Sequence, residues 1–333
     1  MSVRLRKLGE VTVLARDTDD EFLLKAEPHR RELLAHCYRM TGSLHDAEDL
    51  VQETYLRAWK AYGGFKGQSS LRTWLYRIAT NTCLTALDSR QRRPLPTGLG
   101  QPSSDATAEL TERAEVPWLE PLPDDASDPS TIVGSRESVR LAFVAALQHL
   151  SPRQRAVLVL RDVLQWRAAE VADAIGTSTA AVNSLLQRAR AQLDQVGPSE
   201  DDQIAEPDSP ETRDLLDRYI AAFEAYDIDE LVKMFTDDAI WEMPPFDGWY
   251  QGPEQIVTLT RVHCPAQGPG DMRFLRTTAN GQPAAALYML NRDSGEHEAF
   301  QLHVLDVKPG GVSHVVAFLD TALFEKFDLP ASL

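Results

Sequence analysis

Residues between positions 43 and 93 carry side chains whose types and spacing suit binding to other macromolecules. Asp49, Gln52, Glu53 and Leu56 recur at helical spacing and make an acidic face with one apolar residue. Such a face suits docking onto a basic partner helix, and the alternative is an ordinary solvated surface. Further along, arginine, asparagine and aromatic residues are interleaved. That mixture is typical of single-stranded nucleic-acid binding, because cations hold phosphates while rings receive unstacked bases.

A second set, near the C-terminus, has the residue types for acid–base chemistry. Glu242, Asp247 and His303 lie among apolar residues, and an apolar lining can shift a pKa toward the value that proton transfer needs. However, a lone histidine on an apolar strand is more often a buried structural residue, and no paired acid and base stands out. We therefore expect a non-enzymatic domain with no catalytic residue, no cofactor and no metal. Its candidate pocket or docking surface comprises Trp241, Met243, Phe246, Asp247, Trp249, Tyr250 and His303.

Two amphipathic helices must position the first set. Ser43 followed by Asp46 is a capping-box-like start for the first helix, and the loop GGFKGQSS ends it. Ser69 or Ser70 caps the second helix. The predicted inward stripes are Ala47, Leu50, Val51, Thr54 and Ala58 in the first helix, and Leu71, Leu75, Ile78, Ala79, Thr82 and Ala86 in the second. The residues predicted to lie outside the second stripe are Arg72, Tyr76, Arg77, Thr80 and Asn81, while Trp74 packs against the preceding helix.

The segments DAEDLVQETYLRAW and SSLRTWLYRIATNTCL closely resemble region 2 of the sigma-70 family, in its extracytoplasmic-function (ECF) branch. The resemblance implies that the first helix docks on RNA polymerase core, and that the loop and second helix read and open the promoter −10 element. The implied core-binding residues are Asp49, Gln52, Glu53 and Leu56. The implied −10-binding residues are Phe65, Lys66, Gln68, Ser69, Arg72, Arg77 and Asn81.

A helix-turn-helix is predicted within RAAEVADAIGTSTAAVNSLLQRARAQL. That motif needs a small residue where the helices touch, a glycine for the left-handed turn and an apolar anchor in the second helix. Ala172, Gly176 and Val182 meet these needs. The segment resembles sigma region 4, which reads the −35 element, although Asn183 and Leu185 stand where a lysine and an arginine are frequent. The candidate −35-binding residues are Thr177, Ser178, Thr179, Asn183, Ser184, Gln187, Arg188 and Arg190, with Val182 and Leu186 turned inward.

After residue 209 the pattern predicts two helices, a strand, a turn and a third helix, followed by four β-rich runs. Asn280-Gly281 and Pro309-Gly310-Gly311 are predicted hairpin turns. Helices first and an antiparallel sheet after make an α+β domain. The order YIAAFEAYDIDELVKMFTDDAIWEMPP and then DGWYQGPEQI resembles the SnoaL-like domains of the nuclear-transport-factor-2 superfamily, which are cones that enclose a pocket. The predicted strands are roughly 272–279, 284–291, 298–307 and 312–319.

Charge divides the chain into modules. The net charge is −16, yet residues 21–95 carry 12 Lys and Arg against 8 Asp and Glu, and residues 136–196 carry 8 against 5. Only these two mildly basic modules suit phosphate binding. The segment 94–135 is acidic and rich in Pro and Ser, which is typical of a flexible linker. Its apolar island, Val116-Pro117-Trp118-Leu119, is expected to anchor on a neighbouring domain.

The sequence also indicates a cytoplasmic protein that makes no use of the membrane. No apolar run approaches the ~20 residues that span a bilayer, and residues 1–20 lack the apolar core of a secretory signal. The isolated Cys37, Cys83 and Cys264 fit a reducing compartment. The expected organisation is multidomain, with two all-α modules and one α+β cone: an N-terminal extension (1–20), region 2 (21–93), an acidic Pro-rich linker (94–135), region 4 (136–196), a second linker (197–209) and the SnoaL-like domain (210–333).

The resemblances imply an ECF sigma factor that directs RNA polymerase core to promoter DNA, with its activity modulated by the fused C-terminal domain. An anti-sigma factor or a small-molecule ligand of that domain are further candidate partners. Docking onto the basic modules is expected through the turn Asp247-Gly248-Trp249-Tyr250. The alternatives are a ligand-responsive helix-turn-helix regulator, which leaves residues 43–93 unexplained, and an enzyme activity in the C-terminal domain.

Overall fold

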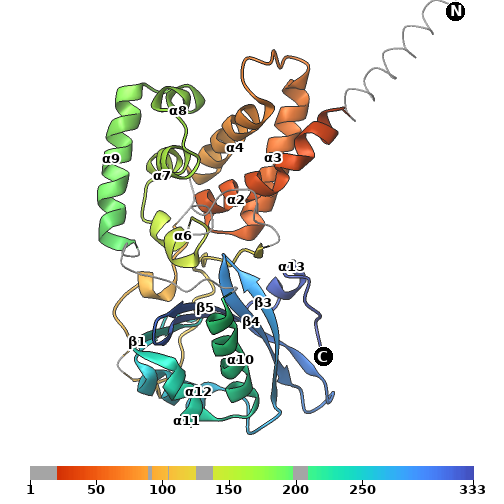
Figure 1. Cartoon of the computed structure of the whole chain (residues 1–333), viewed down its shortest axis with the longest axis vertical. Coiled ribbons are helices and arrows are strands. Elements are labelled where there is room, and N and C mark those ends of the chain that lie inside the picture. Colours follow the sequence, from red (N-terminus) through yellow and green to blue (C-terminus); the bar gives the residue numbers. More distant parts are fainter. Residues whose placement is uncertain (1–20, 89–91, 104, 125–137, 198–208) are drawn as a thin grey trace, which may run out of the picture. The chain divides into compact units, whose positions relative to one another are not determined.

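The computed structural model describes residues 21–88, 92–103, 105–124, 138–197 and 209–333 (Figure 1). Contacts divide these residues into two compact units. The helical unit comprises residues 21–88 and 150–192, and the sheet unit comprises the remaining described residues. The predicted N-terminal extension, residues 125–137 and most of the second linker lie outside the described residues.

Three helices make the first half of the helical unit. A helical segment (21–26) and a 3-10 turn (Glu27–His29) lead into α2 (Arg30–Thr41), which is followed by α3 (Leu44–Tyr62) and α4 (Leu71–Leu87). The Ser43 hydroxyl caps α3 by accepting a hydrogen bond from the Asp46 backbone N–H at 3.1 Å. The Ser70 hydroxyl caps α4 by accepting one from the Thr73 backbone N–H at 3.0 Å. Both caps satisfy backbone donors that a helix start leaves free. The predicted stripe of α3 is buried: Ala47, Leu50, Val51, Thr54 and Ala58.

The prediction for two residues of α4 is wrong. Tyr76 and Thr80, expected on the outer face, are 1% and 0% exposed. The Thr80 hydroxyl lies 3.0 Å from His36 Nε2 on α2, and Trp166 packs edge-on against the Tyr76 ring at 6.2 Å between centroids. Two different neighbours therefore cover α4, whereas periodicity along one helix reveals only one buried face.

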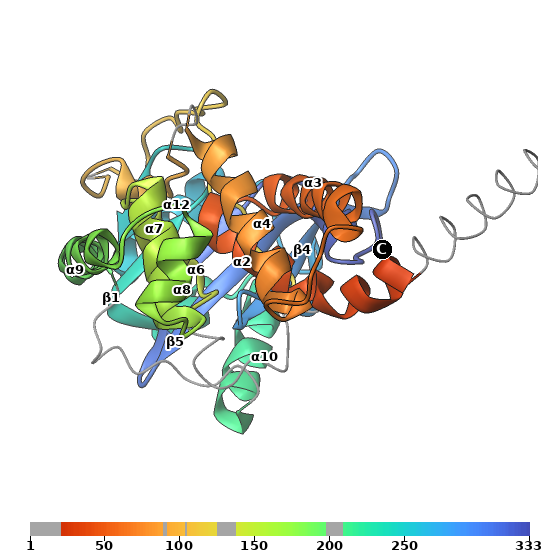
Figure 2. The ribbon, with the colours of Figure 1, turned by 90° about the horizontal axis from the view of Figure 1, so that it is seen from above.

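The second half of the helical unit is the helix-turn-helix. Its helices are α7 (Pro152–Leu158), which continues into a π-helical turn (Val159–Val163), α8 (Ala168–Ala174) and α9 (Thr179–Val196). Gly176 has φ 64° in the turn, Val182 is fully buried, and Ser178 Oγ accepts the Ala181 N–H at 3.2 Å at the start of α9. The glycine in the left-handed turn and the apolar anchor predicted for the helix-turn-helix are thus present. In Figure 2, α7 and α8 lie along α4, which they contact.

A buried arginine ties α7 to α2 inside this unit. Arg155 is 4% exposed and donates to the carbonyl oxygens of Met40 and Leu150. Burial lowers its pKa to about 10, so the guanidinium remains charged at neutral pH. A buried charge persists only where hydrogen-bond partners compensate its desolvation. Arg155 therefore fixes how the helix-turn-helix meets the first three helices.

The sheet unit is built on six strands. They are β1 (Phe235–Glu242), β2 (Trp249–Gln251), β3 (Met272–Ala279), β4 (Gln282–Leu290), β5 (His297–Lys308) and β6 (Gly311–Phe318), in the order β2-β1-β6-β5-β4-β3. The last four match the predicted runs closely. The sheet is mixed rather than antiparallel, because β1 and β6 pair in parallel. That pairing joins strands almost seventy residues apart, a distance over which local sequence patterns carry no information.

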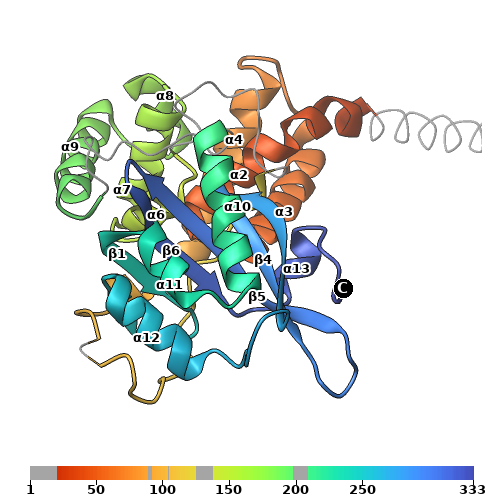
Figure 3. The same ribbon diagram turned by 60° about the horizontal axis from the view of Figure 1, so that its bottom comes forward.

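Turns and helices complete this unit. Asn280 and Gly281 have φ 58° and 69°, as a two-residue turn between antiparallel strands requires. Helices α10 (Pro210–Glu224), α11 (Ile228–Met234) and α12 (Pro253–His263) cover one face of the sheet in Figure 3. The core lies between these helices and the strands. A short helix, α13 (Leu323–Lys326), packs against β5.

The predicted flexible linker is, over its described part, a packed component of the sheet unit. We call residues 92–103 and 105–124 the strap. Leu119 and Leu122 of the strap are fully buried, Pro123 forms a β-bridge with Ala279, and Glu112 forms another with Phe246. The apolar island therefore anchors as expected, but its acidic, Pro-rich surroundings are ordered with it. The amino-acid composition predicted a flexible linker because most residues of this segment are polar. Its order comes from two buried leucines and from backbone hydrogen bonds to the sheet, which composition does not reveal.

Helix α6 (Leu141–Leu147) also belongs to the sheet unit. Its first N–H, at Leu141, donates to Gln282 Oε1 at 2.9 Å. The preceding Arg140 forms a 2.7 Å ion pair with Asp306. The sequence assigned residues 136–149 to the helix-turn-helix module, but the described part of this segment packs with the sheet. Among the residues the structure describes, no helix is long and apolar enough to cross a membrane, and no group of three metal-ligating side chains gathers.

Candidate polymerase and nucleic-acid interfaces

The acidic face of α3 is accessible. Asp49, Gln52 and Leu56 are exposed, and Glu53 is partly exposed. Glu53 accepts a hydrogen bond from Arg57 Nε at 2.7 Å along the helix. An ion pair of this kind on a helix surface contributes little to stability and yields easily to a partner. The four residues predicted to bind polymerase are thus placed on one open face.

This face includes a residue that the sequence reasoning missed. Trp59 is 45% exposed and Leu56 is 51% exposed, and they lie three residues apart on α3. That spacing was the available signal, since positions i and i+3 share a helix face. Large exposed apolar side chains are typical of contact surfaces. We call Asp49, Gln52, Glu53, Leu56 and Trp59 together the docking face.

The loop before α4 carries an aromatic row. The half-buried Phe65 stacks near-parallel on Tyr62, at 6.3 Å between ring centroids, and contacts Trp74 at 4.9 Å. The ring contact of Trp74 is thus with the loop, where packing against the preceding helix was predicted. The predicted neighbours Lys66, Gln68 and Ser69 are exposed. Exposed polar residues around a stacked ring could receive a nucleotide base.

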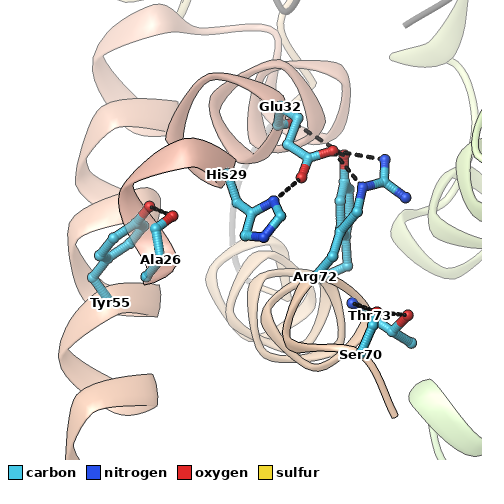
Figure 4. Close-up of polar contacts among 8 residues, drawn as sticks. Ala26, His29, Glu32, Tyr55, Ser70, Arg72 and Thr73 are labelled. Atoms are coloured by element: carbon cyan, nitrogen blue, oxygen red, sulfur yellow. Dashed lines mark hydrogen bonds and ion pairs between the residues drawn. The ribbon is translucent and has the colours of Figure 1, made fainter. Parts of the chain in front are cut away.

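Arg72, also predicted to bind DNA, is engaged within the helical unit (Figure 4). Its Nε donates to the buried Glu32 carboxylate at 2.6 Å, and its guanidinium lies over the Tyr76 ring, 4.9 Å from the centroid. The same carboxylate contacts His29 Nδ1 at 2.6 Å and accepts from the Tyr76 hydroxyl at 3.2 Å. Burial, together with the Glu32 charge, raises the pKa of Tyr76. Through these contacts Arg72 links α4 to α2.

The remaining −10 candidates on α4 contact the helix-turn-helix. Arg77 Nη1 lies 2.8 Å from Asp173 Oδ2, and Asn81 Nδ2 donates to the Ala174 carbonyl at 2.8 Å. Both partners lie on α8. Arg77 remains 49% exposed, so the contact is at the edge of the interface. In this arrangement α8 occupies part of the face predicted to meet the −10 element.

The second helix of the helix-turn-helix presents a polar face. Val182 and Leu186 turn inward as predicted, with 0% and 7% exposure. Arg188 is exposed, and its Nε donates to the Ser184 carbonyl one turn earlier at 3.3 Å. Ser178 and Thr179 at the start of α9 are exposed, and a helix N-terminus favours phosphate binding. The exposed candidates on this face are Ser178, Thr179, Asn183, Ser184, Gln187 and Arg188, while Thr177 is half-buried.

Arg190 differs from the other candidates. Its guanidinium makes two hydrogen bonds to Asp162, at 2.9 and 2.6 Å. A bidentate guanidinium–carboxylate pair of this type is directional and holds both side chains in place. Arg190 therefore links α9 to the turn after α7, and its predicted DNA contact would require that pair to open.

The sheet unit contains a largely apolar cavity of about 280 Å³ that is partly open to solvent. Four predicted residues line it, namely Trp241, Met243, Phe246 and His303. His303 is fully buried, with Nδ1 2.9 Å from the Tyr219 hydroxyl and Nε2 3.0 Å from Gln301 Oε1. Burial lowers its pKa to about 3. The imidazole is therefore neutral, with both nitrogens already bonded.

The acid–base arrangement considered from the sequence is not assembled in this cavity. Among the residues that the structure describes, no Asp or Glu lines the cavity. Asp247 lies instead in a turn against the strap, 3.5 Å from Arg113. Glu242 is hydrogen-bonded to Thr97 and His314, neither of which lines the cavity. Of the three acid–base candidates, His303 therefore lines the cavity without Glu242 or Asp247 beside it.

The turn from Asp247 to Tyr250 contacts the strap. The Trp249 indole donates to the Gly100 carbonyl at 3.0 Å, and the Trp249 carbonyl accepts the Ser103 N–H at 2.7 Å. The Asp247 N–H donates to the Thr111 carbonyl at 3.1 Å. The sequence predicted a different partner for this turn, the basic modules; the partners that the structure shows are residues of the strap.

A polar cluster also joins the strap to the sheet. Glu242 is fully buried; His314 Nε2 lies 2.7 Å from its Oε1, and the Thr97 N–H donates to its Oε2 at 2.8 Å. Burial alone would lower the pKa of His314. The hydrogen bond and charge of Glu242, together with the charge of Asp306, outweigh burial and raise that pKa above its ordinary value. The cluster therefore favours a charged His314.

Comparison with protein-family models gives three matches along the chain. Sigma-70 region 2 matches residues 26–93, sigma-70 region 4 matches residues 140–193, and a SnoaL-like domain matches residues 216–314. The order is the one expected from the sequence. The first two models cover the docking face, α4 and the helix-turn-helix.

Similar proteins support the same assignment over the whole length. The ECF RNA polymerase sigma factor SigG of Mycobacterium tuberculosis is 71% identical, covering 100% of this chain and 92% of its own. The sigma factor SigJ of the same species is 30% identical over 73% of each chain. The crystal structure of SigJ matches the fold with a TM-score of 0.61 at 23% identity, covering 93% of this chain and 99% of its own. The chain belongs to the ECF RNA polymerase sigma factors and carries a fused SnoaL-like domain.

Proposed function

We propose that the chain binds RNA polymerase core through the docking face of α3 and directs it to promoters. The observation that carries this proposal is the exposure of two acids, an amide, a leucine and a tryptophan on one helix face. A helix of the core with basic and apolar side chains would bury Leu56 and Trp59 and pair with the acids. Mixed faces of this kind combine affinity from apolar burial with orientation from charge.

Core binding by variants tests this proposal. The double variant Asp49→Lys with Glu53→Lys should lose at least tenfold in affinity for purified core, because attraction becomes repulsion. The matched control is Glu254→Lys with Asp293→Lys, two exposed acids of the sheet unit that change net charge equally. Circular dichroism should show unchanged helix content, since none of the four residues is buried. Equal core binding by both double variants would exclude the docking face.

The two DNA-binding modules are proposed to divide promoter recognition. The loop and α4 meet the −10 element through Phe65, Lys66, Gln68, Ser69, Arg77 and Asn81, with Arg72 acting as their support. The polar face of α9 meets the −35 element, with its N-terminus on phosphate and its side chains toward base edges. Functional boundaries at residues 21–93 and 136–196 are proposed for these modules, with 94–135 and 197–209 as connections and 210–333 as the regulatory domain.

The C-terminal domain is proposed to be a regulatory binding domain rather than an enzyme. Support comes from the neutral His303, whose two ring nitrogens are both hydrogen-bonded, and from the described part of the cavity lining, which has no carboxylate. Regulation would act through the strap, which connects the two DNA-binding modules in sequence, and through α6 at the start of the second module, because both pack on the sheet. An anti-sigma protein and a small molecule are the candidate signals. Promoter activity that is unchanged when the chain is truncated after Gln195 would count against this role.

A further inference from the structure

A second cavity of the sheet unit lies on the face of the sheet opposite to helices α10–α12. Ala239 and Leu305 belong to the core beneath those helices. Because successive residues of a strand point to opposite faces, Asp238, Ile240 and Asp306 point to the other face, where they line a partly open cavity of about 520 Å³. We call this the rear cavity. Its volume is in the range of natural small-molecule sites.

Three parts of the chain form the walls of the rear cavity. The strap contributes residues between Arg92 and Gly98, the α6 segment contributes residues between Arg140 and His149, and β1, β5 and β6 form the base. The strap begins where the match to sigma region 2 ends, and Arg140 is the first residue of the match to region 4. A molecule in this cavity therefore touches chain segments that adjoin both DNA-binding modules.

Arg92 lies on the strap side of the rear cavity, where its contacts with the described residues are with neutral groups. Its Nη2 donates to the Gly98 carbonyl at 2.9 Å, and its Nη1 donates to His149 Nδ1 at 3.3 Å. Because a guanidinium can only donate, the His149 ring accepts this bond and is neutral. Burial lowers the pKa of Arg92, and burial together with the Arg92 charge lowers the pKa of His149. No Asp or Glu among the described residues pairs with Arg92, and these contacts leave three of its five N–H groups available.

Cations outnumber carboxylates in the described lining of the rear cavity. Arg92, Arg140 and Lys308 line it, against Asp238 and Asp306. Asp306 is held by Arg140 in a 2.7 Å ion pair, so it does not neutralise Arg92. This excess of positive charge is a local exception, because residues 197–333 carry 9 Lys and Arg against 25 Asp and Glu. Clefts with an excess of one sign of charge attract ions of the opposite sign.

The wall next to this cationic group is apolar. The apolar lining residues are Pro94, Leu95, Ala142, Ala145, Ala146 and Ile240. An occupant that fits both parts has one anionic group for Arg92 and an uncharged body that packs on the alanines of α6. Phosphate and carboxylate oxygens match the planar donor geometry of a guanidinium.

We propose that the rear cavity binds a small molecule with one oxyanion group, a phosphate or a carboxylate, which the Arg92 guanidinium receives while the uncharged remainder packs against α6. This inference rests on the proposed regulatory role of the C-terminal domain and names its ligand class and site. The bound molecule contacts the strap and α6 together. Because coupling is reciprocal, a ligand that gains affinity from their packing also stabilises that packing.

Histidine NMR on the full chain tests the site, with phenyl phosphate, benzoate and phenol as probes. The two anions should shift the imidazole resonances of His149, because each lies beside its partner Arg92, whereas phenol should not. A response to only one anion would support the site and identify the anion class. The His303 imidazole reports on the other cavity and should not respond. No shift of His149 with either anion, an equal shift with phenol, or a shift of His303 instead would overturn the proposal.

A charge-neutral variant tests the contact with Arg92. Arg92→Gln should weaken phenyl phosphate binding roughly tenfold or more, the factor expected for hydrogen bonds between charged groups. The matched control is Arg273→Gln, which removes an equal charge from an exposed position of β3 outside the lining and should bind as the wild type does. The His314 resonance monitors strap packing in both variants, since His314 and Thr97 share the Glu242 carboxylate. Equal weakening in the two variants would show a general charge effect and exclude the Arg92 contact.

Hydrogen exchange measures the joint contact with the strap and α6. Bound phenyl phosphate should slow exchange several-fold at the hydrogen-bonded amides of Gly98 and Leu99 in the strap and of Val144 and His149 in the α6 segment. Slower exchange in one segment alone would contradict the joint contact. If truncation after Gln195 changed promoter activity but neither anion bound, the regulatory role would stand and this site would be wrong. If the anions bound but truncation had no effect, the site would stand without that role.

Discussion

Arg77 and Asp173 form a 2.8 Å ion pair that joins α4 to the first helix of the helix-turn-helix. Beside it, Asn81 donates to the Ala174 carbonyl. Arg77 and Asn81 are the residues expected to face the −10 element, so we expect this pairing to compete with DNA. Both side chains of the pair are about half exposed or more, and such pairs contribute at most about 1 kcal/mol. The contact is therefore weak enough to open when polymerase and promoter bind.

Removing the charge of Asp173 should make Arg77 more available to DNA. We expect Asp173→Asn to bind a single-stranded −10 oligonucleotide up to about fivefold more tightly, the equivalent of the energy of one exposed pair. Fluorescence anisotropy with a labelled non-template strand measures this. Asp162→Asn is the matched control, because it releases Arg190 instead and should not change −10 binding. A weaker or unchanged affinity in Asp173→Asn would show that the pair does not compete with DNA.

The two arginines at the C-terminal half of α9 should behave differently. Arg188 is exposed on the polar face, and its loss should weaken duplex −35 binding and reduce the slope of log affinity against log salt by about one. Arg190 is already paired with Asp162, so Arg190→Ala should change the slope less and the unfolding free energy more. Salt titrations of both variants on the same duplex give the comparison. Identical slopes would contradict the assignment of Arg190 to a structural role.

Asn280 should be a strong anchor of the strap and of the segment that leads into α6. Its Oδ1 accepts the Leu122 N–H at 2.8 Å, and its Nδ2 donates to the Val139 carbonyl at 2.6 Å, all within the buried interior. Asn280→Ala leaves both partners unsatisfied and should lower the unfolding free energy of the sheet unit by roughly 2–4 kcal/mol. Urea unfolding measures the loss. Thr278→Ala, at an exposed position of the same hairpin, should cost far less, and a similar cost would refute the anchor.

The His314 cluster predicts a pH dependence of stability. Glu242 and Asp306 raise the pKa of His314 in the folded chain, against burial and the nearby Lys308 charge. A raised folded pKa means that protonated His314 stabilises the fold fully below the unfolded value of about 6.5, and that this stabilisation is lost as pH rises through the folded pKa. The unfolding free energy of wild type relative to His314→Gln should therefore fall as pH rises above about 7. A difference that stayed constant, or grew, would contradict the ion pair.

Local patterns in the sequence predicted most elements of this fold, and non-local contacts explain the errors. The caps at Ser43 and Ser70 and the glycine turn at Gly176 depend on neighbours within a few residues, so sequence sufficed. The burial of Tyr76 depends on Glu32 of α2 and on Trp166, which lies in the loop before α8. Periodicity within α4 cannot reveal them.

The candidate-site residues likewise fall into those that local sequence patterns predicted and those that depend on contacts between separate elements. The docking face was predictable because helical spacing alone places its residues together, and Trp59 was missed although the same spacing includes it. The engagement of Arg72 by Glu32 and of Arg190 by Asp162 could not be predicted, because each pair joins separate elements. The ordered strap was predicted as flexible, since composition does not show that Leu119 and Leu122 are buried.

Transcription with purified RNA polymerase core tests the central claim most directly. Core supplied with the full chain should give promoter-specific run-off transcripts from genomic fragments of the host, with permanganate-reactive thymines around −10. Core alone, or core with the Asp49→Lys and Glu53→Lys double variant, should give none, while the Glu254→Lys and Asp293→Lys control should match the wild type. If the full chain gave no specific transcript, or if the docking-face variant transcribed as well as the control, promoter-directed initiation through this face would be contradicted.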